Sequence, residues 1–448
     1  MNQEILAAAA ELYVAVHREP ELSGAEERTA ARFARSLRDA GYEVTGGVGG
    51  HGVVGVLRGG PGPTVLIRAE LDALPVREET GLPYASTVTA PVPVMHACGH
   101  DAHLACAAGA AGLLAATAEQ WRGTVVVVGQ PAEETLSGAA AMLDDGLYRR
   151  FPVPDVVLAQ HTAPLPAGMV AHTDGPLLAA SATLEVVLHG RGGHASAPHL
   201  AVDPVLTAAA VVLRLQTVVS RETAPGEPLV LTVGSLHAGG AGNVIPESAS
   251  LQVTLRAFAP ATLERALAAV RRIVRAECAA SGAPREPEIS EVSRSGVTLN
   301  DPAAGEAVRA AHERMLGPER VTRWQPSTAT EDFPLLGPAG VALHGVPGIR
   351  SAYWMLGSVG PAQWAAAGAT AAERLAALPA NHSARFRPHP ALTLRTGIPA
   401  MAAAARAHLG LPAGAASGAG GASDPAAAGG SAAAGSVKVA SESSAGEG

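Results

Sequence analysis

Residues 96–134 read HACGHDAHLACAAGAAGLLAATAEQWRGTVVVVGQPAEE, and the order of elements in this stretch decides the fold. Three imidazoles, one thiol and one carboxylate fall within its first eight positions. An Ala-rich helical run over 102–118 follows, then an apolar strand from Thr124 to Val128, then the adjacent carboxylates Glu133 and Glu134. A helix that leads into a buried strand is the repeating unit of an α/β sheet, so we expect this architecture.

The sequence on both sides of this stretch continues the same alternation. Short apolar runs bounded by Gly, Pro or charged residues are typical of buried strands, and apolar residues at helical spacing lie between them. The expected strands are 52–57, 64–67 and 156–158, and the expected helices are 4–17, 25–40, 137–145 and, near the end, 390–408. Ligands of such sheets bind beyond the carboxyl ends of the strands, where Asp72, the 96–103 segment, Glu133, Glu134 and His161 all fall.

A second pattern begins near Leu178. Strands are expected at 182–189, 229–236 and 250–258, with helices at 204–219 and 261–280, which is enough for a small α+β domain. Because the first pattern returns afterwards, this domain is expected to be inserted into the first one. The expected limits are 1–177 and 288–411 for the catalytic domain, 178–287 for the inserted lid, and 412–448 for a disordered Gly/Ala/Ser-rich tail.

The composition excludes several classes of protein. A chain of 448 residues with 48% hydrophobic and 16% charged residues fits a globular protein of two domains. A net charge of −8 without a block of Lys or Arg makes nucleic acid an unexpected partner. Neither a signal peptide nor a membrane span is evident, and the spacing of the three Cys does not suggest disulfides, so we expect a cytoplasmic protein.

The chemistry-bearing residues point to a metal-assisted hydrolase. Cys98 and His100 can reach one transition metal, and Glu134, His161 and His382 offer further donors. Glu133 points away from its neighbour and is the candidate general base, because a carboxylate beside an activated water must not itself ligate the metal.

The remaining residues of this set have supporting roles or ordinary explanations. Asp72 completes the predicted catalytic residues as the acceptor that orients a metal-bound imidazole. Taken singly, a Cys two before a His, a Glu-Glu pair or one His is more often structural. For His96 and His103 we expect a role in supporting the fold or orienting a ligand, and for Cys106 a place in the core.

Two Gly-rich loops of the inserted segment carry polar residues. His194 lies in GRGGHASAPH (190–199) and Asn243 in GGAGNVIP (239–246). Both could polarise a carbonyl or hold an oxyanion. The alternative is ordinary turn chemistry, in which Gly and Asn are common.

The assembled motifs resemble the M20 family of metallopeptidases and amidohydrolases, in the branch of N-acyl-amino-acid, hippurate and auxin-conjugate amidohydrolases. The matching segments run in the family's order over roughly residues 5–405. They are RAELDALP (68–75), MHACGHDAH (95–103), QPAEE (130–134), GGHA (192–195), NVIP (243–246), EDF (331–333) and NHS (381–383).

The resemblance implies a dimetal aminopeptidase-like catalytic domain and an inserted ferredoxin-like lid that usually dimerises. It implies two divalent ions, of Mn, Zn, Co or Ni, with Glu133 as the base, and a homodimer or larger homo-oligomer. The implied metal ligands are Cys98, His100, Glu134, His161 and His382. His194 and Asn243 would serve the substrate, with His194 reaching the partner subunit's site, and Arg256 would grip a substrate carboxylate.

Three departures from the family pattern stand out. Glu70 replaces the usual Asp, His389-Pro390 replace an Asp-Glu pair, and residues 352–378 are unusually rich in Ala. None removes an implied ligand. We therefore expect an amidohydrolase that cleaves N-acyl amino acids or related conjugates; a dipeptidase or carboxypeptidase, and a non-catalytic metal-binding relative, are the alternatives.

Overall fold

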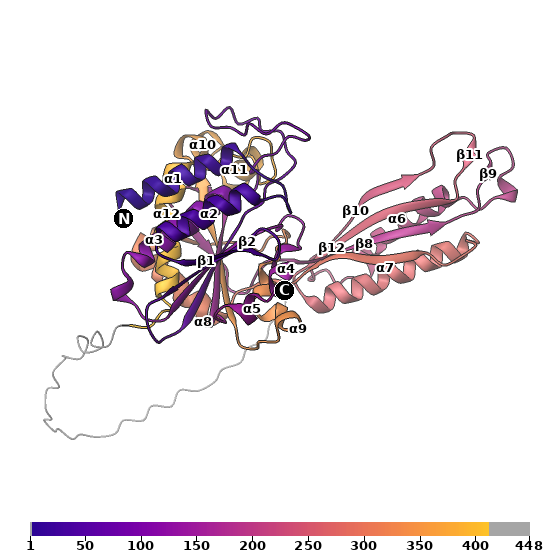
Figure 1. Ribbon diagram of the computed structural model, residues 1–448. Helices are drawn as coiled ribbons and strands as arrows, with labels where there is room; N and C mark the ends of the chain where they lie inside the picture. The colour runs from indigo at the N-terminus through magenta and orange to yellow at the C-terminus, as the bar shows by residue number, and fades with distance from the viewer. Residues whose placement is uncertain (1, 412–448) are drawn as a thin grey trace, which may run out of the picture.

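Two sheets organise residues 2–411, which are the residues that the computed structural model describes (Figure 1). The larger sheet is mixed and has eight strands, of which the inner four run parallel. Its order is β1 (Glu43–Val48), β2 (Gly52–Arg58), β4 (Thr124–Gln130), β3 (Thr64–Glu70), β5 (Val156–Pro166), β16 (Arg350–Val359), β6 (Val170–His172) and β15 (Val321–Arg323).

Helices cover both faces of the larger sheet, which is why its inner strands are apolar throughout. In β4, Val125 and Val127 pack on one side while Val126 and Val128 pack on the other. The first side carries α1 (Gln3–Arg18), α2 (Glu27–Asp39), α3 (His100–Ala115), α8 (Pro302–Leu316) and α12 (Pro390–Arg406). The second side carries α4 (Gly138–Asp144), α5 (Leu147–Arg150) and, beside α4, α9 (Val341–His344). Helices α10 (Pro361–Ala366) and α11 (Ala371–Ala377) follow β16.

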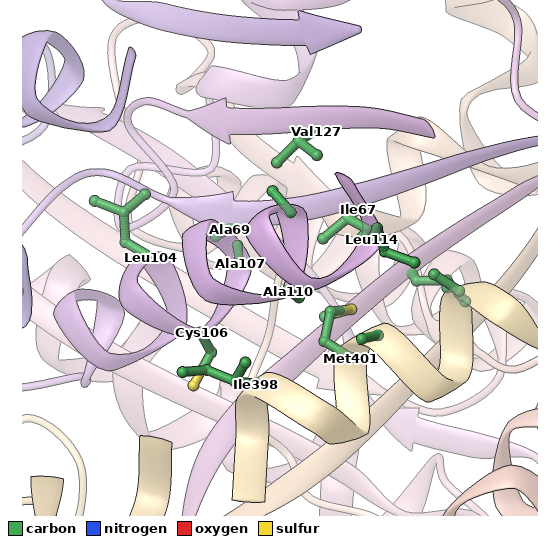
Figure 2. Packing of buried hydrophobic residues seen from close by; sticks show 14 of the residues in the cluster. Ile67, Ala69, Leu104, Cys106, Ala107, Ala110, Leu114, Val127, Ile398 and Met401 are labelled. Atoms are coloured by element: carbon green, nitrogen blue, oxygen red, sulfur yellow. The ribbon is translucent and has the colours of Figure 1, made fainter. Parts of the chain in front are cut away.

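Helix α3 lies between the sheet and α12, and its small residues allow a close approach (Figure 2). A Cβ added at Gly109 would lie 2.7 Å from Ile398, and one at Gly397 would lie 2.5 Å from the sulfur of Cys106. Such tight packing tolerates no added methyl group without a shift. The helix that begins at His100 is therefore held firmly, and Cys106 is a buried core residue, as predicted.

The smaller sheet extends away from the larger one (Figure 1). Its order is β10 (Leu229–Ala238), β12 (Ser248–Ala257), β8 (Ala180–His189) and β13 (Glu288–Ser295). Leu184 of β8 and Val253 of β12 face the helices α6 (Pro204–Arg221) and α7 (Pro260–Ala280), which cover one side of this sheet. We call this unit the lid. Its far end carries the strand pair β9 (Gly193–His194) and β11 (Val244–Ile245).

The predicted fold class, an α/β catalytic domain with an inserted α+β lid, is confirmed. Some expected strands were too short, and some observed strands were not expected. The strand expected at 156–158 continues to Pro166, so His161 lies within β5 and not after it. Strands β1 and β16 were not predicted.

The expected domain limits stay predictions. The lid sheet ends at Ser295, beyond the expected limit of 287, because β13 pairs with β8. Next to the lid, β7 (Pro176–Leu178) pairs with β14 (Thr298–Leu299). The tail predicted at 412–448 lies outside the described residues. Among the described helices, none has the length and apolar character needed to span a bilayer.

Candidate metal centre and substrate cavity

A cavity of about 580 Å³ opens between the larger sheet and the lid. One wall contains the predicted metal ligands Cys98, Glu134, His161 and His382, and the opposite wall contains residues of the lid sheet such as Arg256. A volume of this size suits a small organic substrate.

Cys98, His100 and His161 form the first group of donors, whose candidate ligand atoms lie within 4.8 Å of one another. The Nδ1 atom of His100 is 2.9 Å from the carbonyl oxygen of Asp72, and Nδ1 of His161 is 2.8 Å from that of Thr162. Each imidazole thus uses Nδ1 to donate to a carbonyl, which leaves the lone pair of Nε2 free. Nε2 of His161 lies 3.4 Å from the sulfur of Cys98.

Cys98, Glu134 and His382 form a second group, which shares the thiol with the first. Nε2 of His382 is 3.5 Å from Oε2 of Glu134. The backbone of His382 has a φ of 69°, a left-handed conformation that residues other than Gly rarely adopt. Its N–H donates to the carbonyl of Ala97 at 2.7 Å, and the side chain of Asn381 donates to that of Cys98 at 3.1 Å. These bonds hold the imidazole beside the 96–103 segment.

These two groups fit a pair of divalent transition ions. Nε2 of His100 and Oε1 of Glu134 are buried without a hydrogen-bond partner, which is costly unless a cation takes that place. Burial raises the pKa of the Cys98 thiol to about 12, so a thiolate there requires a bound cation. Burial lowers the pKa of His161 to about 3, which keeps its imidazole neutral, as a metal ligand must be.

Glu133 and Glu134 lie in a loop with left-handed backbone at Ala132 and Leu136. The Oε2 atom of Glu133 is 3.7 Å from Nε2 of His100, but this buried carboxylate also belongs to a separate group with Glu331 and Asp332. Burial and the charge of Glu331 raise the pKa of Glu133, while His100 opposes them. The geometry thus gives the two adjacent carboxylates different surroundings.

Asp72 joins the two parts of the candidate centre. Its Oδ1 lies 3.4 Å from Nδ1 of His100, and its Oδ2 accepts from the N–H of Glu134 at 2.9 Å and from the hydroxyl of Ser23 at 2.7 Å. The hydrogen bond of His100 Nδ1 goes to the backbone carbonyl of Asp72, so the role of the Asp72 carboxylate as an orienting acceptor stays a prediction.

A buried ionic network lies beneath the centre, and the sequence reasoning assigned it no role. Arg68 pairs with Glu70, with Glu331 at 2.6 Å and with Asp332 at 3.0 Å. Charged residues inside an otherwise apolar strand were the available signal, since such residues are buried only when paired.

The network also explains the first departure from the family pattern. The Oε2 atom of Glu70 is 2.8 Å from Nδ1 of His103, whose Nε2 accepts from the N–H of Thr162. The longer side chain of Glu70 therefore spans Arg68 and His103. His103 is hydrogen-bonded on both nitrogens, which fits the supporting role expected of it.

The second departure, at His389, is a helix cap. The Nδ1 atom of His389 accepts from the N–H of Leu392 in the first turn of α12 at 3.3 Å, and its own N–H donates to the carbonyl of Ser358. Among the described residues, its polar contacts thus go to the helix and to β16 and not to His382.

The lid residues that were expected to bind the substrate lie at two different locations. Arg256 lines the cavity, where its Nη1 donates to the carbonyl of Thr328 at 2.8 Å. His194 and Asn243 lie at the far end of the lid, where Val244 pairs with His194, and neither is among the described residues that line the cavity. The structure brings the predicted metal ligands, Glu133 and Arg256 together within one chain, but not His194 or Asn243.

Comparisons with known proteins agree with the sequence resemblance. The family model described as Peptidase family M20/M25/M40 matches residues 66–378. Thermostable carboxypeptidase 1 of Saccharolobus solfataricus is 35% identical over 323 residues, covering 71% of this chain and 80% of the relative. Hippurate hydrolase of Campylobacter jejuni is 35% identical over 321 residues, covering 71% of this chain and 82% of the relative.

A solved structure supports the same fold. The crystal structure of the Bacillus subtilis YXEP protein, described as a dinuclear metal binding peptidase from M20 family, superposes with a TM-score of 0.69 at 26% identity. The match covers 90% of this chain and 98% of that one. The likeness extends over both the larger sheet and the lid.

Proposed function

The chain belongs to peptidase family M20/M25/M40, and from this premise we propose that it is a metal-dependent amidohydrolase that cleaves N-acyl amino acids or related conjugates. The observation that carries the proposal is the set of side chains around one cavity. Five donor side chains, one further carboxylate and one cationic side chain surround or border it. They are Cys98, His100, Glu134, His161, His382, Glu133 and Arg256.

The donors Cys98, His100, Glu134, His161 and His382 would hold two divalent ions, which supply Lewis-acid polarisation of the amide carbonyl and a more acidic water. Glu133 takes a proton from the attacking water and returns it to the nitrogen of the leaving amine. Asp72 keeps His100 in the tautomer and orientation that ligation needs. Arg256 binds the carboxylate of the substrate's amino acid.

The proposal is tested by elemental analysis combined with a substrate panel. The purified protein should contain close to two divalent ions per chain and should hydrolyse N-acetyl or N-benzoyl amino acids. A chelator should abolish this activity, and the added metal should restore it. Metal content without turnover of any substrate on the panel would instead support the non-catalytic relative. Elemental analysis would also identify the metal among Mn, Zn, Co and Ni.

A carboxypeptidase or dipeptidase is the second candidate, because a relative at 35% identity carries the name thermostable carboxypeptidase 1. Dipeptides and N-acyl amino acids both place a carboxylate next to the scissile amide, so Arg256 suits either. Parallel assays of N-benzoylglycine and glycyl dipeptides separate the two. Higher kcat/KM on the dipeptides would favour this candidate.

We further propose a homodimer that forms through the lid. Strand β10 is at an edge of the lid sheet, and the neighbouring helix α6 exposes Leu206 (70%) and Leu213 (73%). Unpaired strand edges and large exposed apolar side chains are typical of surfaces that bind another chain. In a two-fold dimer, His194 and Asn243 at the far end of one lid would reach the cavity of the partner. We also propose that the protein is located in the cytoplasm.

A further inference from the structure

The lid sheet has one side without helices, and this open side changes character along its length. Next to the cavity-facing part of this side, Gln252 of β12 lies opposite Glu185 of β8, and both have longer polar side chains. Toward the cavity these give way to short hydroxyl side chains. Thr254 and Thr183 occupy the next pair on the same side, followed by Arg256 and Ser181. Because side chains alternate along a strand, residues 252, 254 and 256 share one side of the sheet.

One row of hydroxyls crosses all four strands of the lid sheet. Ser293 pairs with Thr183, Thr183 with Thr254, and Thr254 with Thr232. The first three line the cavity, but Thr232 does not. The hydroxyls of Thr183 and Thr254 are 3.0 Å apart, so one of the two protons remains free to donate to another acceptor. Short side chains also leave room that a Gln or Glu would fill.

The position of this row beside Arg256 defines which part of a substrate it meets. Thr254 precedes Arg256 by two residues on the same strand, which places the two side chains about 7 Å apart. If Arg256 holds the carboxylate of the amino acid, as in the proposed function on which this inference rests, the side chain of that amino acid lies nearest to the hydroxyl row.

The charge of the cavity narrows the class of side chain. Among the described residues that line it, Arg256 is the only Arg or Lys, whereas Glu133, Glu134 and Glu331 are acidic. A second carboxylate on the substrate would therefore find hydroxyl donors but no second cation. An apolar side chain would remove water from the hydroxyls without replacing its hydrogen bonds.

We infer that Thr183, Thr254 and Ser293 form a subsite for a neutral, hydrogen-bonding side chain of the amino acid released by hydrolysis. Threonine and valine have the same shape and differ in one hydroxyl, so they form a matched pair of probes. We expect kcat/KM for N-acetyl-L-threonine to exceed that for N-acetyl-L-valine by roughly ten-fold, the scale of one or two neutral hydrogen bonds.

The variant Thr254→Val removes the hydroxyl and keeps the shape of the side chain. It should lower the threonine-to-valine ratio of kcat/KM to about two or less, mainly through KM for the threonine substrate. Thr254→Ser should retain the preference. The control Thr232→Val makes the same change in the same row, outside the cavity, and should leave the ratio at its original value.

Three outcomes would overturn the inference. The first is a ratio near or below one in the unaltered protein, and the second is an equal response to Thr254→Val and Thr232→Val. In the third, Thr254→Val changes the preference between N-acetylglycine and N-hydroxyacetylglycine but not the preference between N-acetyl-L-threonine and N-acetyl-L-valine. The hydroxyl row would then contact the acyl group of the substrate and not its amino acid. Hydrolysis of both N-acetyl substrates with a ratio near one contradicts the subsite alone, whereas a metal-loaded protein that hydrolyses neither contradicts the proposed function as well.

Discussion

The ends of the inner strands of the larger sheet and the open side of the lid sheet form opposite walls of one cavity, and they are built in different ways. The first wall consists mainly of buried ionisable groups, several of which are held by fixed hydrogen-bond partners; the Oδ2 atom of Asp72, for example, accepts from the hydroxyl of Ser23 and from the N–H of Glu134. The second is made of partly exposed hydroxyls and a single guanidinium. The difference indicates that one wall carries chemistry, which needs fixed geometry, and the other carries recognition.

The two walls also differ in how complete they are. The donors and Glu133 come together within a single chain, from segments as distant as Cys98 and His382. On the lid, Arg256 reaches the cavity but His194 does not. We call the wall with the metal-ligand candidates and Glu133 the chemical wall, and the open side of the lid sheet the recognition wall. If the chemical wall is complete in one chain and the recognition wall is shared between two copies, substitutions in the two walls should affect activity in different ways.

The largest effect is expected at Glu133. Glu133→Gln keeps the size of the side chain but removes the base, so turnover should fall by about 10³-fold, within the range for general acid–base catalysis. Elemental analysis should show an unchanged metal content, because Glu133 is not among the proposed ligands. Glu134→Gln is the matched comparison, since it should lose metal as well as activity. Full turnover in Glu133→Gln would remove this residue from the base's role.

A smaller loss, of about 10²-fold in kcat, is expected for His194→Ala if the imidazole stabilises an oxyanion. The decisive measurement mixes this variant with Glu133→Gln under conditions that exchange subunits. Half of the resulting dimers are mixed, and each mixed dimer has one site with both residues intact, so about a quarter of the full activity should return. A mixture no more active than its components would place His194 outside the partner's site.

Much of the chemical wall could be predicted from the sequence because its residues follow apolar strands. Glu133 and Glu134 come shortly after β4, and Asp72 comes just after β3. The end of a strand is visible as a change from apolar to polar residues, and parallel strands bring their ends to one edge. His382 has no such signal, since it lies in an irregular loop held by the carbonyl of Ala97. The residues alone made it one possible further donor, and the family resemblance implied it as a ligand.

The recognition wall was less predictable for a physical reason. Thr183 and Thr254 are ordinary residues of a half-exposed strand, and which side of a strand faces a cavity depends on how the lid sits against the larger sheet. The ionic network of Arg68, Glu331 and Asp332 was missed because its partners are 263 and 264 residues apart in the sequence. Long-range pairings of this kind follow from the fold and not from local pattern.

A buried ion pair between α1 and the start of α3 stabilises the chemical wall. His17 of α1 lies between two buried carboxylates, 2.6 Å from Asp101 beside His100 and 3.1 Å from Glu78, with the rings of Tyr13 and Tyr84 packed around it. Burial alone would lower the pKa of His17, but the hydrogen bonds to the two carboxylates raise it to about 10. His17→Gln should lower the free energy of unfolding by about 3 kcal/mol at pH 6, as expected for a broken buried pair.

The pH dependence of this loss has a definite sign. A raised pKa in the folded state means that the stabilisation is complete below the ordinary value of 6.5 and is lost as the pH rises toward 10. The free energy of unfolding, measured with urea, should therefore differ less between the unaltered protein and His17→Gln at pH 10 than at pH 6. The difference should also narrow at low pH, where Asp101 and Glu78, whose pKa values are lowered despite their burial by the bonds to His17, become protonated. If the difference in free energy of unfolding grew from pH 6 to pH 10, it would contradict an ion pair of His17 with Asp101 and Glu78.

The smallest effect is expected at His389, which lies outside both walls. Because Nδ1 of His389 caps α12, His389→Asp should substitute a better cap and add a negative charge at the helix N-terminus. The free energy of unfolding should rise by about 0.5 kcal/mol, with Tm higher by about 1 °C. His389→Ala, which removes the cap, should shift both in the opposite direction. Neither variant should change kcat/KM or metal content by more than about two-fold, since the contacts of His389 go to Leu392 and Ser358 and not to His382. A ten-fold change in activity at constant stability would show instead that this position communicates with the proposed metal ligand seven residues before it, and the chemical wall would then extend to the start of α12.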